Sequence, residues 1–134
     1  MTRVFRVVVP ATDIERSTAF YAHVFQTPGE RVSPSRHYFH LGQVILVCVA
    51  PRNEGKTGDV QPNSQPIDFA VDDLDEAFAR AKTAGCSWLE EKIETRPWGE
   101  RAFVVKDPLG NPLYFVDAAT CFTGFRAPPA RDVA

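Results

Sequence analysis

The sequence predicts an α+β fold built from two tandem modules, each with a strand, a helix and three further strands. The first observation behind this prediction is a repeat. Val9–Glu15 and Phe69–Asp75 both lead from an apolar strand through an acidic turn into a helix, and they lie 60 residues apart. The second is that each helix is followed by apolar runs separated by turn residues, a pattern typical of consecutive strands. A duplicated βαβββ unit explains both observations.

The first module is predicted at about residues 3–50. Val4–Val9 is almost entirely apolar and β-branched, which favours a strand. The apolar spacing then becomes helical from residue 14, with Thr12 or Asp13 as the N-terminal cap, and Pro28 with Gly29 is expected to end the helix. Three strands are expected at residues 30–33, 36–41 and 44–49. The last is apolar at consecutive positions, so we expect both of its faces to be covered.

A polar linker at about residues 51–65 precedes the second module, at about residues 66–118. This module is expected to contain a strand at Ile67–Val71 and a helix that begins after Asp73 and stops at Gly85. Strands are expected at residues 87–95, 101–106 and 112–117, and a Pro- and Ala-rich tail at residues 119–134. The whole chain is interpreted as a single domain.

The composition excludes several function classes. The chain has 134 residues, of which 44% are hydrophobic and 24% charged, as expected for one globular domain. A net charge of -2 and a pI of about 5.9, without basic clusters, argue against a nucleic-acid or anionic-membrane partner. No apolar run is long enough to span a bilayer, and the N-terminal residues lack a signal-peptide core. A cytoplasmic location is therefore expected.

Three segments, ATDIERSTAFY, FAVDDLDEAFARAKTAG and PWGERAFVVKDPLGNPLYFVD, together resemble the vicinal oxygen chelate superfamily. This superfamily includes glyoxalase I, bleomycin-resistance proteins and extradiol dioxygenases, and the resemblance covers about residues 3–117. It implies that each module curls its sheet into half of an open barrel, with the helices outside and a ligand in the concave space. It also implies a homodimer in which both subunits build each cavity.

Metal-dependent members of the superfamily carry four ligands on inward-facing strand positions. Matching the Asp13 turn to the equivalent turn of the superfamily places Arg6, Val47, Pro66 and Tyr114 at these positions. None is a ligand of the expected kind, since one phenol beside Arg, Val and Pro supplies too few donors. His37 and His40 do not replace them, because residues three apart on a strand point to opposite faces. The sequence therefore predicts neither a metal nor another cofactor.

The same matching gives a candidate ligand-binding set with an apolar lining and a few polar groups. Its members are Arg6, Val8, Val47, Asp68, Trp98, Arg101 and Tyr114, with Ile45, Val49, Ala70 and Val116 beside them. Arg6 is expected either to bind a carboxylate or phosphate, or to pair with Asp68. Trp98 and Arg101 are expected either to contact the ligand or to fix a corner of the fold.

Three functions fit these residues. The first is metal-independent binding or sequestration of a small organic molecule, such as a drug or metabolite, in a dimeric cleft. The second is a lyase, isomerase or dioxygenase-like enzyme that uses Tyr114 and Asp68 as acid and base, or an unaligned metal. The third is an accessory module whose pocket has collapsed onto Trp98 or Phe39.

Overall fold

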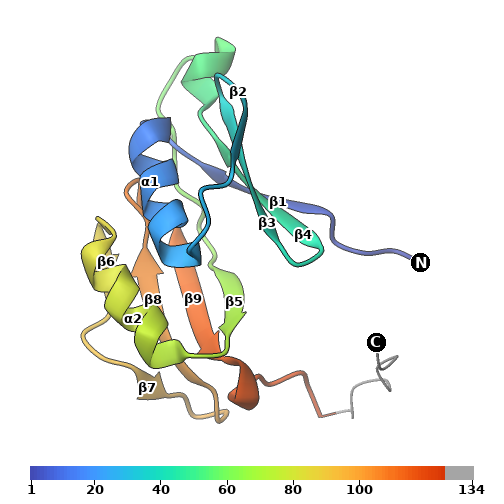
Figure 1. The fold of residues 1–134 in the computed structure, drawn as a ribbon, viewed down its shortest axis with the longest axis vertical. Coiled ribbons are helices and arrows are strands. Elements are labelled where there is room, and N and C mark those ends of the chain that lie inside the picture. Colours follow the sequence, from blue (N-terminus) through green and yellow to red (C-terminus); the bar gives the residue numbers. More distant parts are fainter. Residues whose placement is uncertain (126–134) are drawn as a thin grey trace.

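The computed structural model describes residues 1–125, and Figure 1 shows them as two sheets with two helices. The first module contains β1 (Arg6–Pro10), α1 (Ile14–Phe25), β2 (Glu30–Ser33), β3 (Arg36–Leu41) and β4 (Val44–Val49). The second contains β5 (Ile67–Val71), α2 (Leu74–Thr83), β6 (Trp88–Leu89), β7 (Glu94–Thr95), β8 (Arg101–Lys106) and β9 (Pro112–Asp117). Short 3₁₀ helices follow at η1 (Pro51–Glu54) and η2 (Ala118–Thr120). The α+β fold is confirmed, while residues 126–134 of the predicted tail lie outside the described residues.

One predicted strand, at residues 87–95, is divided into β6 and β7. Both pieces pair with β8, but the ladder is interrupted between them. The reason is that the side chain of Glu90 accepts the Val104 amide at 2.9 Å, in place of a backbone carbonyl. The chain then turns before β7 begins at Glu94.

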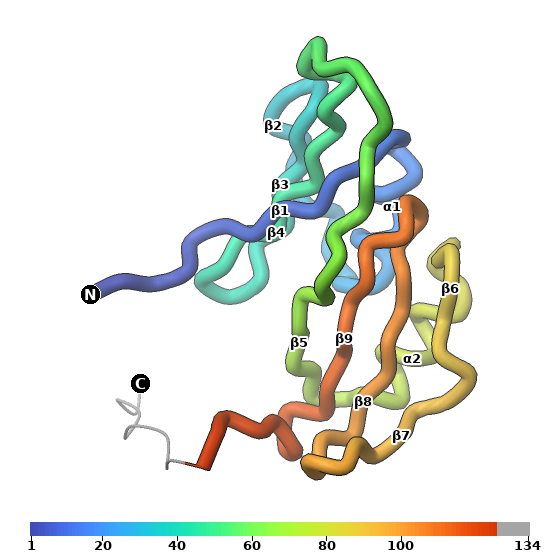
Figure 2. Tube along the Cα trace, turned by 180° about the vertical axis from the view of Figure 1, so that it is seen from behind, coloured from blue at the N-terminus to red at the C-terminus, as the bar shows by residue number. Residues whose placement is uncertain are grey.

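Both sheets have the same topology. In the first sheet the order is β1-β4-β3-β2, and in the second it is β5-β9-β8-β6, with β7 also on β8. β1 runs parallel to β4 and β5 runs parallel to β9, whereas the other pairs are antiparallel. β1 and β5 are consequently edge strands of their sheets. Figure 2 shows the second sheet from the face opposite α2.

Local sequence signals set the ends of the helices. Asp13 caps α1 by accepting the Arg16 amide at 3.1 Å, and Asp73 caps α2 by accepting the Glu76 amide at the same distance. α1 ends earlier than expected, at Phe25, because Gln26 adopts a left-handed conformation with φ 56°. Gly29 is then required for packing, since a Cβ there would lie 2.6 Å from the Tyr38 carbonyl oxygen.

A single hydrophobic core joins the modules. It lies between the helices and the faces of the sheets that they cover, and it includes buried Phe20, Tyr21, Phe103 and Phe115. The apolar β4 strand is buried from Leu46 to Val49, which confirms that both of its faces are covered there. Neither helix of residues 1–125 is long and apolar enough for a membrane crossing.

The other side of each sheet, here called the helix-free face, carries no helix. On the first sheet the strand register aligns Arg6 with Ile45 and Val8 with Val47, and on the second it aligns Asp68 with Tyr114 and Ala70 with Val116. On the helix-free faces, the edge strands β1 and β5 are not covered by other side chains. Val8 of β1 is 48% exposed, and both Asp68 and Ala70 of β5 are exposed. The two sheets share their core through their helix-covered faces, and within residues 1–125 they do not close into a barrel.

Candidate functional site

Polar and aromatic side chains gather around Glu100 on the helix-free face of the second sheet. The Tyr114 hydroxyl and the Trp98 indole Nε1 both donate to Oε1 of Glu100 at 2.7 Å. The backbone amide of Phe122 donates to Oε2 at 2.9 Å. Donors from the same turn, from β9 and from the segment after η2 thus converge on one carboxylate. We call Glu100, Tyr114, Trp98 and neighbouring Asp68 the Glu100 cluster.

The turn before β8 places Glu100. The Arg96 amide donates to the Glu100 carbonyl at 2.7 Å, and the Gly99 amide donates to the Arg96 carbonyl at 2.9 Å. Gly99 has φ 98°, a conformation that side chains disfavour, so this tight turn depends on glycine. The turn leaves Trp98 54% exposed, with its ring available to a ligand.

An ion pair borders the cluster. Arg96 donates from Nη1 and Nη2 to the two carboxylate oxygens of Glu90 at 3.0 and 2.7 Å. The same guanidinium lies 5.7 Å from the centre of the Tyr114 ring. Because Glu90 also accepts the Val104 amide, the pair is tied to β8 and fixes the Tyr114 ring.

The charges of the cluster are well defined. Burial raises the pKa of Tyr114, as does its hydrogen bond to Glu100, and the pKa reaches about 12. Burial alone would raise the pKa of Glu100, but the hydrogen bonds from Trp98, Phe122 and Tyr114 lower it below its ordinary value. At neutral pH Tyr114 is therefore a protonated phenol and Glu100 a carboxylate.

Asp68 is the acceptor left for a ligand. It lies opposite Tyr114 in the register of β5 and β9, and its carboxylate makes no hydrogen bond or ion pair among the described contacts. Burial, and then the negative charge of Glu100, raise its pKa above the ordinary value. A ligand amine or hydroxyl can donate a hydrogen bond to this exposed carboxylate.

The predicted residues of the first sheet form a separate group. Arg6 is exposed, donates from Nη1 to the Tyr38 hydroxyl at 3.0 Å, and lies 4.7 Å from the centre of the Phe5 ring. The alternative pairing of Arg6 with Asp68 is not formed within the chain. Val8 is half-exposed and Val47 is buried on the same face.

Arg101 is not brought together with the other predicted residues. It is the first residue of β8 and points to the helix-covered face, where it donates to Asp75 of α2 at 2.9 Å. Asp117 lies 3.8 Å away on the same side. Of the two expected roles for Arg101, the geometry matches the structural one, which anchors α2 to the sheet.

The residues at the four family metal positions do not fit a metal ion. Arg6 is a cation bound to Tyr38, Val47 and Pro66 have no donor side chain, and the high pKa of Tyr114 opposes formation of a phenolate ligand. Across residues 1–125, no three His, Cys, Asp or Glu side chains are grouped as a metal site would require.

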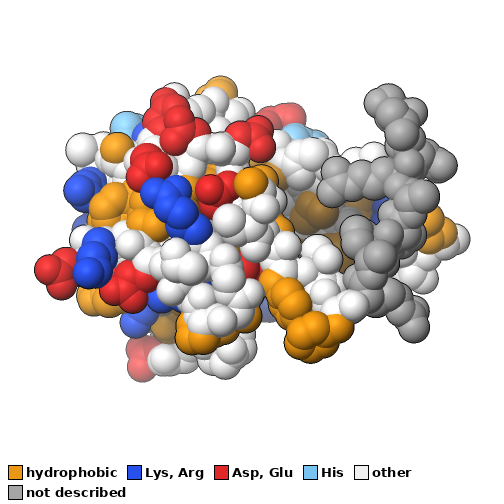
Figure 3. Space-filling view, turned by 90° about the horizontal axis from the view of Figure 1, so that it is seen from below, with side chains coloured by type: hydrophobic (Ala, Val, Ile, Leu, Met, Phe, Trp, Pro, Cys, Tyr) orange, Lys and Arg blue, Asp and Glu red, His pale blue; other side chains and the backbone are white. Residues whose placement is uncertain are grey.

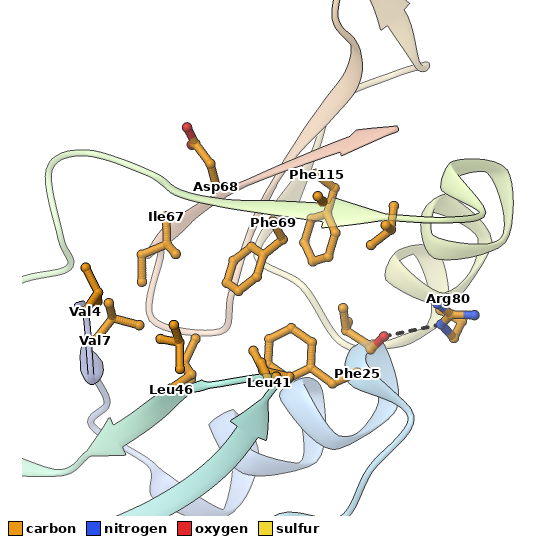
Figure 4. Close-up of a pocket in the computed structure, with 15 residues that line it drawn as sticks. Val4, Val7, Phe25, Leu41, Leu46, Ile67, Asp68, Phe69, Arg80 and Phe115 are labelled. Carbon is orange, nitrogen blue, oxygen red and sulfur yellow. Dashed lines mark hydrogen bonds between the residues drawn. The ribbon is translucent and has the colours of Figure 1, made fainter. Parts of the chain in front are cut away.

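A cavity of about 670 Å³ lies elsewhere, in the seam between the two modules. Among the residues predicted for the site, Asp68 and Ala70 border it, and Figure 4 shows the Asp68 carboxylate pointing away from the other labelled side chains. The walls come mainly from Phe25, Phe69 and Phe115 with aliphatic neighbours. Figure 3 shows that charged side chains of both signs gather on the left half of the surface seen from below, and that hydrophobic side chains lie in a hollow on the other half.

The sequence interpretation missed three residues of the site: Glu90, Arg96 and Glu100. Glu100 stood within the motif Trp98 to Arg101, but only the ends of that motif were assigned roles. A signal was available, since Glu100 is the one acidic residue of this turn and lies two residues from Trp98. Glu90 and Arg96 carried no comparable signal, because their pairing depends on the interruption between β6 and β7.

Comparisons with known proteins agree with this fold. The model of the Glyoxalase/Bleomycin resistance protein/Dioxygenase superfamily matches residues 3–115. A glyoxalase-related enzyme from Fulvimarina pelagi is similar in structure, with TM-score 0.74 and 20% identity over 87% of this chain and 88% of that one. No curated protein matches the sequence.

Two further solved structures share the fold. A glyoxalase/bleomycin resistance protein from Albidiferax ferrireducens T118 has TM-score 0.70 and 22% identity, over 84% of this chain and 95% of that one. Lactoylglutathione lyase from Agrobacterium tumefaciens has TM-score 0.67 and 21% identity, over 87% and 94%. At these identities the similarity establishes the fold alone.

Proposed function

The chain belongs to the glyoxalase/bleomycin resistance protein/dioxygenase superfamily, and from this premise we propose that it binds a small organic molecule at the Glu100 cluster without a metal ion. The observation that carries the proposal is the cluster itself. It combines an exposed indole at Trp98, an unpartnered carboxylate at Asp68 and a fixed phenol at Tyr114. An aromatic or flat ligand with an amine or hydroxyl group matches this combination.

A second copy of the chain completes the cleft in this proposal. β1 and β5 are edge strands whose ladders end at the surface, and exposed edges of this kind favour pairing with another chain. Phe5 and Val8 add exposed apolar surface beside β1. A homodimer that covers both edges would bring Arg6 and Val8 of one copy toward the Glu100 cluster of the other.

The dimer has a direct test with a matched control. Val8 and Val32 are 48% and 46% exposed, and both lie on edge strands of the first sheet. Val8→Asp is expected to give a monomer by size-exclusion chromatography with light scattering, whereas Val32→Asp stays dimeric. A wild-type monomer, or equal behaviour of the two variants, contradicts the proposed interface.

Ligand binding is tested by screening small aromatic amines and alcohols against chelator-free protein by native mass spectrometry. For a ligand found in this way, Trp98→Ala and Asp68→Asn are each expected to weaken binding about tenfold or more. Trp88→Ala is the control, because Trp88 is 49% exposed but lies against Lys106 at the opposite end of β8. Unchanged affinity in the Trp98 and Asp68 variants would show that the site lies elsewhere.

Metal independence is tested by metal analysis of untagged protein, before and after incubation with nickel, zinc, manganese and ferrous salts. Substoichiometric metal is expected in every sample after removal of the excess. One metal ion per cleft would overturn the proposal and favour a glyoxalase- or dioxygenase-like enzyme.

Asp68 supports a second candidate function, a lyase or isomerase. A carboxylate without a partner, whose pKa is raised, is suited to accept a substrate proton. Tyr114 is not suited to be the base, since its pKa of about 12 keeps it protonated. For any turnover detected, loss of the acidic limb of the pH-rate profile in Asp68→Asn supports this candidate, and an unchanged profile rejects it.

A further inference from the structure

The cavity in the seam between the modules is bordered by β5, and Asp68 is the one member of the Glu100 cluster that lines it. Consecutive side chains of a strand point to opposite faces. Phe69 therefore points into the cavity, while the carboxylate of the preceding Asp68 points away from it, as Figure 4 shows. A molecule in the seam cavity contacts the helix-covered side of β5 and the edge of this strand, where Asp68 and Ala70 also border the cavity. It leaves Trp98, Glu100 and Tyr114 uncovered, because none of these residues lines the cavity.

The core holds the walls of the seam cavity in place. The Phe69 ring stacks on Phe115 at 5.1 Å between centres and packs against Phe25 of α1 at 5.4 Å. Phe115 is 1% exposed, so this aromatic wall belongs to the core that joins the modules. The hairpin between β3 and β4 supplies the opposite wall with Leu41 and Val44. The cavity is consequently preformed.

The size and chemistry of the cavity suit a small molecule. Its volume of about 670 Å³ lies inside the usual range of small-molecule sites, which is roughly 300–1,000 Å³. Water gains little there, because the apolar walls offer few hydrogen-bond partners. An apolar ligand of comparable size is therefore the favoured occupant.

Arg80 of α2 gives the cavity one cationic end (Figure 4). Its Nε donates to the Val24 carbonyl at 3.3 Å, which holds the side chain against the end of α1. Its Nη1 lies 3.3 Å from Glu76, whose side chain is 65% exposed, so this pair is weak. Nη2 makes none of the described contacts. The guanidinium can therefore donate to a ligand carboxylate and keep the hydrogen bond from Nε to the Val24 carbonyl.

We propose that the seam cavity is a second binding site, for an amphipathic monocarboxylate whose apolar body lies against Phe25 and Phe69 and whose carboxylate binds Arg80. This site goes beyond the function proposed for the Glu100 cluster and does not depend on it. The class of ligand follows from the apolar walls together with one fixed cation.

The test is calorimetric titration of the full-length protein with decanoate, with decanol and decyltrimethylammonium as probes of the same tail and different charge. Decanoate is expected to bind with one site per chain and at least about tenfold more tightly than decanol, and decyltrimethylammonium more weakly still. Arg80→Gln is expected to remove the preference for decanoate. Arg52→Gln, an arginine change on η1 away from the cavity, leaves it intact.

Location is tested by amide chemical shifts and by filling the cavity. Decanoate is expected to shift the amides of Leu41, Phe69 and Arg80, and Val44→Trp is expected to abolish binding while wild-type dispersion of the spectrum is retained. Shifts confined to Trp98 and Tyr114, or equal binding by Arg80→Gln, would overturn the proposal. Dissociation of a dimer by decanoate would also overturn it, because a second copy would then be the occupant.

Discussion

The hydroxyl of Tyr21 on α1 donates a 2.6 Å hydrogen bond to the Asp107 carboxylate, in the turn between β8 and β9. Asp107 is fully buried and also accepts the amides of Leu109, Gly110 and Asn111. The side chain of Asn111 donates both to Asp107 and to the Pro10 carbonyl at the end of β1. The Asp-Pro-Leu-Gly-Asn turn is thus a joint that fixes the second module against the first.

Tyr21→Phe is expected to destabilise the protein by about 1–3 kcal/mol, because it leaves a buried carboxylate with one donor fewer. Burial, followed by the nearby Asp107 charge, raises the pKa of Tyr21 well above its ordinary value, so the phenol remains a donor at neutral pH. Urea denaturation measures the change. Tyr38→Phe is the matched control and is expected to have a smaller effect, since its partner Arg6 is exposed to water. Equal losses would contradict the special role of the joint.

Glu90→Gln is expected to lower stability at neutral pH by about 1–2 kcal/mol, since it removes a charged acceptor of Arg96 and Val104. Hydrogen bonding to Arg96 lowers the pKa of Glu90 against the opposing effect of burial. A lowered folded-state pKa contributes stability above the ordinary Glu value of about 4.3, and this contribution is lost as pH falls further.

Urea unfolding at neutral pH and at about pH 3 tests this dependence on Glu90. The difference in unfolding free energy between wild type and Glu90→Gln is expected to shrink in acid. Glu91→Gln is the control, because the neighbouring Glu91 makes no ion pair among the described contacts. A difference that stayed constant with pH would mean that Glu90 contributes through packing and not through its charge.

Much of the fold was predictable because its signals are local. The caps at Asp13 and Asp73 and the parities of β1 and β5 depend on neighbouring residues, so the faces carrying Val8 and Asp68 were assigned from the sequence. The prediction of one strand at residues 87–95 was wrong in the middle of that range. There the Val104 amide donates to the Glu90 side chain in place of a backbone carbonyl of the ladder.

The site was less predictable because it depends on contacts between distant segments. Arg101 is the first residue of β8, and a shift of one residue along the strand would move its side chain to the other face of the sheet. Its partner Asp75 lies 26 positions away in sequence. The seam cavity depends on how the two modules pack, through contacts such as that of Phe25 with Phe69. Neither relationship has a periodic or motif signal, so only the three-dimensional arrangement reveals it.

Asp68→Asn is expected to raise the stability of the protein slightly at neutral pH. Burial and the Glu100 charge raise the folded-state pKa of Asp68, so its stabilising contribution is present below the ordinary Asp value of about 3.9 and is lost as pH rises through the folded pKa. The asparagine side chain of the variant does not ionise, so the variant does not lose this stability as the pH rises. Thermal unfolding at neutral and acidic pH measures the effect, with Asp72→Asn as the control, because Asp72 is also exposed and follows the same strand. A lower melting temperature for Asp68→Asn at neutral pH would show that the carboxylate has a stabilising partner.

Glu100→Gln is expected to lower the pKa of Tyr114 from about 12 toward the ordinary value, because the carboxylate that opposes phenolate formation is removed. The fall is expected to be partial, since burial is the larger cause and Arg96 already acts in the opposite direction. Tyrosinate absorbance follows the titration, with Tyr114→Phe identifying the transition. A transition that the substitution does not move would separate Tyr114 from Glu100 and remove it from the proposed site.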